Sequence, residues 1–146
     1  SSDLANFNSK EQYILSGLEE DFLIFKQNIA HLKARIIPLK VAGAFHSPFM
    51  KEASQEFENF LINQTFNSLQ VPYVSNVTAK IYHHLDKKEF IDLLTKQLYS
   101  SVLWYQSILN FDESHHFIEI GPSTVLTNLM KKIYPEAISY SYEGVL

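Results

Sequence analysis

His46 is the side chain whose neighbours most clearly predict a functional position. It lies in the stretch Val41–Met50, after Gly43 and just before Ser47-Pro48. Serine can cap a helix and proline suits its first turn, so we expect His46 at a strand-to-helix corner. Imidazole can take up and return one proton near neutral pH, which is the chemistry of a general base. The alternative is a structural histidine in a capped turn, and these residues alone leave both open.

The other histidines do not have the spacing of a metal site. Two adjacent pairs occur, and neighbouring side chains point apart on a strand and lie about 100° apart on a helix. Neither pair has the i, i+4 partner and nearby carboxylate that zinc sites use. We interpret both as surface pairs: His83-His84 and His115-His116.

Composition excludes several classes of function. The 146 residues are 46% hydrophobic and carry a net charge of -4, which indicates one globular domain without the basic surface that nucleic acids require. Cysteine is absent, and four glycines cannot form a Gly-rich phosphate loop or a Gly-x-Ser-x-Gly elbow. The sequence has no apolar run of membrane-spanning length and no signal-peptide pattern, so we expect a cytoplasmic protein that does not bind membranes.

Hydrophobic periodicity predicts a mixed α/β fold with short connections. Leu18, Phe22, Phe25, Ile29 and Leu32 recur at helical spacing and predict a buried helix face. The expected strands are 4–7, 12–15, 35–41, 71–77, 117–120 (buried) and 137–142. The expected helices are 18–32, 48–64, 86–99 (capped by Asp86), 102–111 and 124–133.

Three polar positions have two interpretations each. Ser75-Asn76 ends an apolar strand, either as a cap or as a substrate contact. Gln97 lies among apolar residues of its helix, either as a structural hydrogen-bonding group or as an orienting group beside a site. The turn Gly121–Thr124 could bind an anion at a helix N-terminus, although a plain turn capped by Ser123 or Thr124 is the simpler interpretation.

In combination these motifs resemble the malonyl-CoA:acyl carrier protein transacylases, which include the acyltransferase domains of fatty-acid and polyketide synthases. Each motif is weak alone, but they occur in the family's order over nearly the whole chain. They are Asn6-Phe7-Asn8-Ser9, Ile14-Leu15-Ser16-Gly17, 37–50 (with Gly43-Ala44-Phe45-His46-Ser47), Val74-Ser75-Asn76-Val77, Gln97-Leu98-Tyr99-Ser100 and Ile118-Glu119-Ile120-Gly121-Pro122.

The resemblance implies ping-pong transfer of malonyl from coenzyme A, through a serine ester, to the phosphopantetheine thiol of an acyl carrier protein. His46 matches the general base, and Gln97 matches the residue whose backbone carbonyl orients that base. Phe45 matches a position that is aromatic in malonyl-selective members and smaller in methylmalonyl types. Asn8 and Asn76 are expected to contact substrate. The coenzyme A thioester is a substrate, and no resident cofactor or metal is implied.

The sequence departs from the family in ways that predict a partial enzyme. The Gly-His-Ser-x-Gly nucleophile elbow, the malonyl-binding arginine and the oxyanion segment all lie upstream in the family; Arg35 does not match that arginine. Ser101 stands where proline is frequent. We therefore expect a C-terminal fragment, inactive alone, that needs the missing N-terminal half. Residues 1–45 would belong to a ferredoxin-like small subdomain and residues 46–146 to the C-terminal part of an α/β-hydrolase-like large one.

Two other functions remain possible from the sequence. An acyl hydrolase on the same scaffold would keep His46 but lack the carboxylate-binding arginine. A non-catalytic module could instead dock an acidic carrier protein through local positive charge, at Lys40, Lys51, Lys87 and Lys88.

Overall fold

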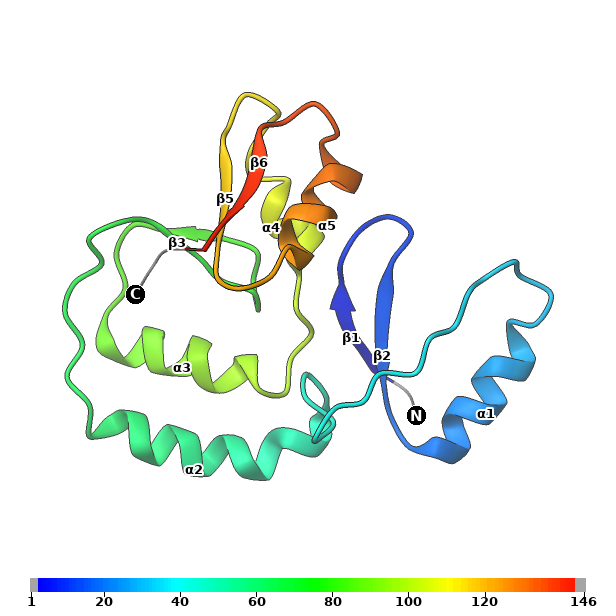
Figure 1. The fold of residues 1–146 in the computed structure, drawn as a ribbon. Helices are drawn as coiled ribbons and strands as arrows, with labels where there is room; N and C mark the ends of the chain where they lie inside the picture. The colour runs from blue at the N-terminus through cyan, green and yellow to red at the C-terminus, as the bar shows by residue number, and fades with distance from the viewer. Residues whose placement is uncertain (1–2, 144–146) are drawn as a thin grey trace.

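The fold, a computed structural model that describes residues 3–143, combines helices with small sheets, which confirms the mixed α/β class (Figure 1). Its helices are α1 (Glu19–Asn28), the 3-10 turn η1 (Pro48–Met50), α2 (Lys51–Ile62), α3 (Lys87–Gln97), α4 (Trp104–Ile108) and α5 (Val125–Ile133). Its strands are β1 (Asp3–Phe7), β2 (Tyr13–Ser16), β3 (Tyr73–Val74), β4 (Ile81–Tyr82), β5 (Phe117–Ile120) and β6 (Ser139–Tyr142). Within the described residues, no helix is long and apolar enough to cross a membrane.

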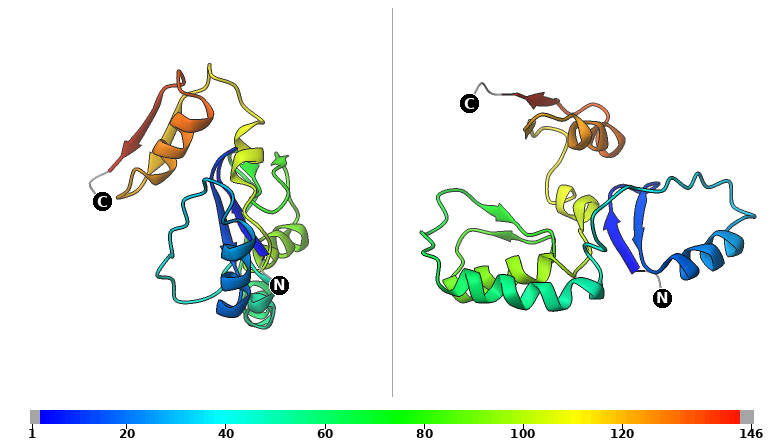
Figure 2. Two further views of the ribbon diagram at one scale, coloured as in Figure 1. Left: turned by 90° about the vertical axis from the view of Figure 1, so that its right-hand side faces the viewer. Right: turned by 60° about the horizontal axis from the view of Figure 1, so that its bottom comes forward.

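The strands form separate two-stranded sheets across the described chain. β1 pairs with β2 and β3 with β4 in antiparallel fashion, whereas β5 and β6 are parallel. The parallel pair is joined through α5, which packs on both strands, as expected because parallel strands need a crossover connection. Both views of Figure 2 show α5, β5 and β6 as a group set off from α2 and α3.

The helices α2 and α3 lie side by side in the lower part of Figure 1 and share a small core. Leu61 of α2 and Ile91 and Leu93 of α3 are buried. Asp86 begins α3 with a complete capping box: its carboxylate accepts the backbone N–H of Glu89 at 2.8 Å, and the Glu89 side chain accepts the N–H of Asp86. The predicted cap is therefore confirmed.

Substituting Asp86→Ala is expected to lower the free energy of unfolding by about 0.5–2 kcal/mol, because a first-turn N–H loses its acceptor. Asp92→Ala is a suitable control, since it removes only an exposed pair with Lys96, worth about 0.3–0.5 kcal/mol. Chemical denaturation of both variants compares them. Equal losses would show that the capping box does not stabilise α3.

The strand predicted at residues 35–41 is wrong, because the structure has irregular backbone there. Ile37, Leu39 and Val41 are exposed despite their apolar character. A strand is stable only when its N–H and C=O groups pair with a neighbour, and no strand of the described chain pairs with this segment. Pro38 also lacks a backbone N–H.

The predicted burial of two apolar faces is also wrong. α1 ends at Asn28, four residues before the expected end, and none of its residues is buried; Leu18 and Leu32 beside it are exposed. On β5 the side chains of Ile118 and Ile120 are 51% and 83% exposed. Both segments have the periodicity of buried elements, but the described chain packs nothing over these side chains.

Tertiary pairing shortens two further elements. The helix expected at 102–111 begins only at Trp104, because Val102 is bonded to β1: its N–H donates to Ala5 O at 2.8 Å and its carbonyl accepts from Phe7 N. The strand expected at 71–77 ends at Val74, because Ser75 enters a tight turn closed by the Ala79 N–H. The expected 48–64 helix begins as η1 and ends at Ile62.

Candidate functional site

His46 lies in a turn before η1 and is held at the C-terminal end of α3. Its Nδ1 lies 2.9 Å from the backbone carbonyl oxygen of Gln97, and its backbone N–H donates to the carbonyl of Leu98 at 2.8 Å. The last carbonyls of a helix have no partner within the helix, so they are free to accept these bonds. His46 is thus attached to the end of α3 twice, through its ring to the Gln97 carbonyl and through its backbone to the Leu98 carbonyl.

The bond to Gln97 decides the tautomer of a neutral His46. A carbonyl oxygen can only accept, so Nδ1 must carry the proton. In the neutral ring Nε2 is then unprotonated and can accept a proton from a substrate or nucleophile.

The conformation of the turn differs from the strand-to-helix corner that the sequence predicts. His46 has φ = 62°, in the left-handed region that non-glycine residues rarely adopt. Ser47 occupies the position before η1, but its side chain makes no cap bond. Its hydroxyl instead donates to the carbonyl of Ala44 at 2.6 Å, so the predicted capping role of this serine is wrong.

The segment 97–103 joins the other predicted site segments. Asn76 contributes its carbonyl, which accepts the N–H of Leu103 at 2.8 Å, and Val102 pairs with β1, the strand that leads to Asn8. The hydroxyl of Ser101 donates to the carbonyl of Leu4, a bond that proline at this position could not make. Three segments far apart in the sequence therefore meet along one backbone stretch.

The predicted site residues have different environments around this stretch. His46 and Gln97 are in direct contact, through the Gln97 backbone rather than its amide. Asn8 is buried, Asn76 is half-buried and Phe45 is 48% exposed. In the described chain no hydrogen bond links Asn8 or Asn76 to His46. The four paired histidines are exposed, which confirms them as surface residues.

Sequence reasoning missed two further groups that hold the turn of His46. One is the Leu98 carbonyl and the other is the Ser47 hydroxyl. The carbonyl has no signal in the sequence, because every residue has one. The serine was visible beside His46, but its partner three residues back depends on how the turn closes.

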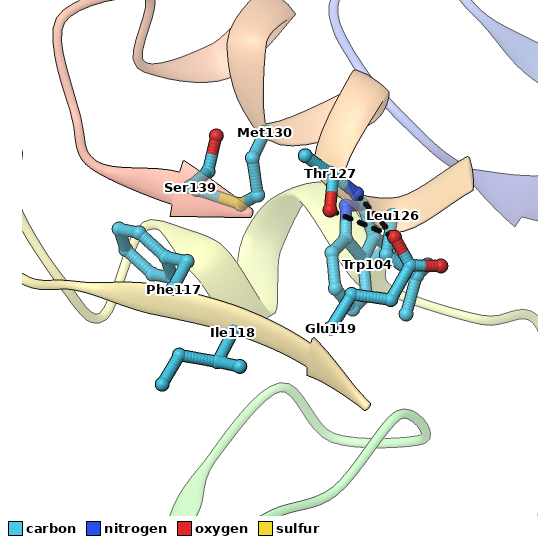
Figure 3. Close-up of a pocket in the computed structure, with 8 residues that line it drawn as sticks. All are labelled: Trp104, Phe117, Ile118, Glu119, Leu126, Thr127, Met130 and Ser139. Atoms are coloured by element: carbon cyan, nitrogen blue, oxygen red, sulfur yellow. Dashed lines mark hydrogen bonds between the residues drawn. The ribbon is translucent and has the colours of Figure 1, made fainter. Parts of the chain in front are cut away.

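A separate hollow of about 90 Å³ lies between β5, α4 and α5, and none of the predicted site residues lines it (Figure 3). One of its lining residues is Glu119, whose carboxylate accepts the backbone N–H and the hydroxyl of Thr127, each at 2.8 Å, and the hydroxyl of Ser123. Glu119 therefore caps α5, whereas the side chains of Ser123 and Thr124 do not. The protein's own carboxylate thus occupies the helix N-terminus that could have bound an anion.

These bonds predict a pH-dependent contribution to stability. Partial desolvation raises the pKa of Glu119, but the hydrogen bonds from Thr127 and Ser123 together outweigh it and lower the pKa from 4.5 to about 2. Because the pKa of Glu119 is lower in the folded than in the unfolded chain, the ionised carboxylate stabilises the fold above pH 4.5. This contribution to stability disappears as the pH falls toward 2.

We expect Glu119→Gln to weaken this pH dependence, whereas the exposed Glu136→Gln should leave it unchanged. Denaturant unfolding measured between pH 6 and pH 3 compares the two variants with the native chain. The same slope in all three proteins would contradict the expected role of Glu119.

Comparisons with known proteins agree on one family. No family model matches the chain. The malonyl-CoA:acyl carrier protein transacylase BaeC of Bacillus velezensis is 39% identical over 138 residues, which are 92% of this chain but 47% of that protein. The transacylase structure from Streptococcus pneumoniae superposes with a TM-score of 0.88 at 31% identity, over 99% of this chain and 48% of that one.

A further solved structure contains a type II polyketide synthase acyl carrier protein in complex with its malonyl-transacylase. It superposes with a TM-score of 0.88 at 27% identity and covers 99% of this chain. The chain thus spans about half the length of each of these three proteins. In sequence and in fold, the chain is similar to the C-terminal half of malonyl-CoA:acyl carrier protein transacylases.

Proposed function

We propose that this chain supplies the general base of a malonyl-CoA:acyl carrier protein transacylase, and that His46 is that base. The observation that carries the proposal is the bond from Nδ1 of His46 to the Gln97 carbonyl, which leaves Nε2 of the neutral ring ready to accept a proton. Gln97 acts through its backbone, so no carboxylate is needed as the third member of the triad.

The proposed reaction has two steps. In the first, Nε2 of His46 accepts the hydroxyl proton of a serine in the complementary half, and the serine oxygen attacks the thioester carbonyl. The carbon–sulfur bond breaks, and the departing coenzyme A sulfur receives the proton from Nε2. In the second, Nε2 accepts the proton of the carrier thiol, whose sulfur attacks the ester, and the proton then returns to the serine oxygen.

The relatives support malonyl-CoA as substrate and a carrier protein as partner. The names of the matched proteins specify malonyl-CoA, and one matched structure contains a carrier protein. Phe45 lies directly before His46 and is suited to restrict the acyl group, with Asn8 and Asn76 as further substrate contacts. The coenzyme A thioester enters as substrate and no resident cofactor is proposed. A cytoplasmic location stays a prediction from the sequence.

Exposed apolar residues support a complementary half as partner. The outward face of the β5–β6 pair carries Ile118, Ile120, Tyr140 and Tyr142, all exposed. Parallel sheets are normally covered on both faces, and apolar patches this extensive usually mark an interface. The irregular segment 34–41 and α1 have similar exposed residues. We infer that residues 1–45 belong to the small subdomain and 46–146 to the large one.

Reconstitution tests the proposal. The chain is combined with the serine-bearing N-terminal half of the Bacillus velezensis relative, then given malonyl-CoA and a carrier protein. We expect one malonyl mass on the serine half and its transfer to the carrier, whereas the chain alone should transfer nothing because it lacks the nucleophile and oxyanion hole.

The other outcomes distinguish the alternatives. Release of free malonate without carrier loading would indicate the hydrolase, and carrier binding without acylation would indicate the docking module. Malonyl transfer by the chain alone would show that it is not a partial enzyme.

A further inference from the structure

Ser47 is completely buried, although it lies beside the proposed general base. Its exposed fraction is 0%, and its hydroxyl donates to the carbonyl of Ala44 at 2.6 Å. This bond closes the turn that contains His46, because Ala44 and Ser47 flank it on both sides. The carbonyl of Ser47 in turn accepts the N–H of Met50, which attaches the turn to η1.

The turn needs such support because His46 adopts φ = 62°. A non-glycine residue in the left-handed region persists only where its surroundings hold it there. The N–H of His46 bonded to Leu98 holds one side of the residue, and the Ser47 hydroxyl holds the other. Without the hydroxyl, the Ala44 carbonyl loses its partner and the turn can relax toward an ordinary conformation.

Two other roles for Ser47 do not agree with the structure. It does not cap the following helix, because its side chain makes no bond to the first-turn amides. It also does not replace the missing nucleophile, because it is inaccessible and its hydroxyl is directed at Ala44.

We propose that Ser47 is a positioning residue that holds the imidazole of His46 on the Gln97 carbonyl. The effect of Ser47 on the orientation of the ring can be measured in the chain itself. Its effect on the reaction rate rests on the proposed function, because only a transacylase would use the position of the ring.

Ser54 provides a matched control. It is 2% exposed, and its hydroxyl donates to the carbonyl of Lys51 at 2.7 Å, the same i to i−3 pattern as Ser47 to Ala44. It lies on α2, where the helix maintains the backbone without that bond. Ser47→Ala and Ser54→Ala therefore each remove one buried hydroxyl, but only the first removes support from the His46 turn.

The first experiment measures the tautomer of His46 by nitrogen NMR of ¹⁵N-histidine-labelled chain, with the signal assigned from a His46→Gln sample. We expect the Nδ1–H form in the native chain and in Ser54→Ala, and a shift toward the Nε2–H form in Ser47→Ala. An unchanged His46 spectrum in folded Ser47→Ala would overturn the proposal. If that variant does not fold, Ser47→Cys, with its weaker donor, decides by the same criterion.

The second experiment uses the reconstituted enzyme. Ser47→Ala should lower kcat by about tenfold or more with KM within about twofold, because a displaced base slows the chemical step without changing substrate binding. Ser54→Ala should leave both constants within about twofold, and Ser47→Cys should recover part of kcat. Equal kcat for Ser47→Ala and Ser54→Ala would overturn the catalytic part. If the native enzyme transfers no malonyl, the proposed function fails, whereas the NMR result still decides the role of Ser47.

Discussion

Replacing His46 with alanine should lower malonyl transfer by the reconstituted enzyme by about 10²–10⁴-fold, the usual contribution of a general base. The variant removes the imidazole ring that lies against the Gln97 carbonyl. Both steps need the same proton acceptor, so formation of the serine ester and transfer to the carrier should both slow. Quenched-flow mass spectrometry of each step measures the two effects separately.

Gln97→Ala is the informative control for this prediction. It removes the amide side chain but keeps the backbone carbonyl that accepts from Nδ1 of His46. We therefore expect a loss of less than about tenfold, far below that of His46→Ala. A His46→Ala enzyme with native transfer rates would instead favour the carrier-docking module, because the histidine would then have no chemical task.

Replacing Phe45 with alanine should change which acyl group is accepted. The ring precedes His46 directly and is 48% exposed, so it is available to contact an incoming acyl chain. Removing it should raise the rate with methylmalonyl-CoA relative to malonyl-CoA by about tenfold or more, since contacts of methyl size are worth about 1–3 kcal/mol in a site. Competition between the two thioesters measures the ratio of their kcat/KM values.

Phe49→Ala serves as the comparison, because Phe49 lies three residues beyond His46 and is exposed to a similar extent, 54%. It should leave the ratio unchanged within about twofold, since general loss of aromatic surface does not select between acyl groups. An equal shift in both variants would show that Phe45 does not act as a selective contact, and the preference for malonyl would then come from the complementary half.

Elements that are stabilised by local interactions could be predicted from the sequence. The β1–β2 hairpin, α2, α3 with its capping box and α5 all appear close to their predicted positions. Helix periodicity, the Asp86 cap and the turn between β1 and β2 involve residues a few positions apart, so the information needed to predict them is contiguous. The motif order likewise predicted the family of the matched proteins, because residue types are what sequence comparison detects.

The backbone groups that hold the site could not be predicted, because they are brought together by long-range contacts. In the sequence, the carbonyls of Gln97 and Leu98 look like any other backbone carbonyl. They become binding groups for His46 because α3 ends beside its turn. Segment 34–41 illustrates the same limit, because β-prone residues form a strand only beside a partner, and no described strand pairs with it. The sequence thus predicts His46 as the proton acceptor, and a long-range backbone contact determines that Nε2 is the nitrogen left without the Gln97 carbonyl.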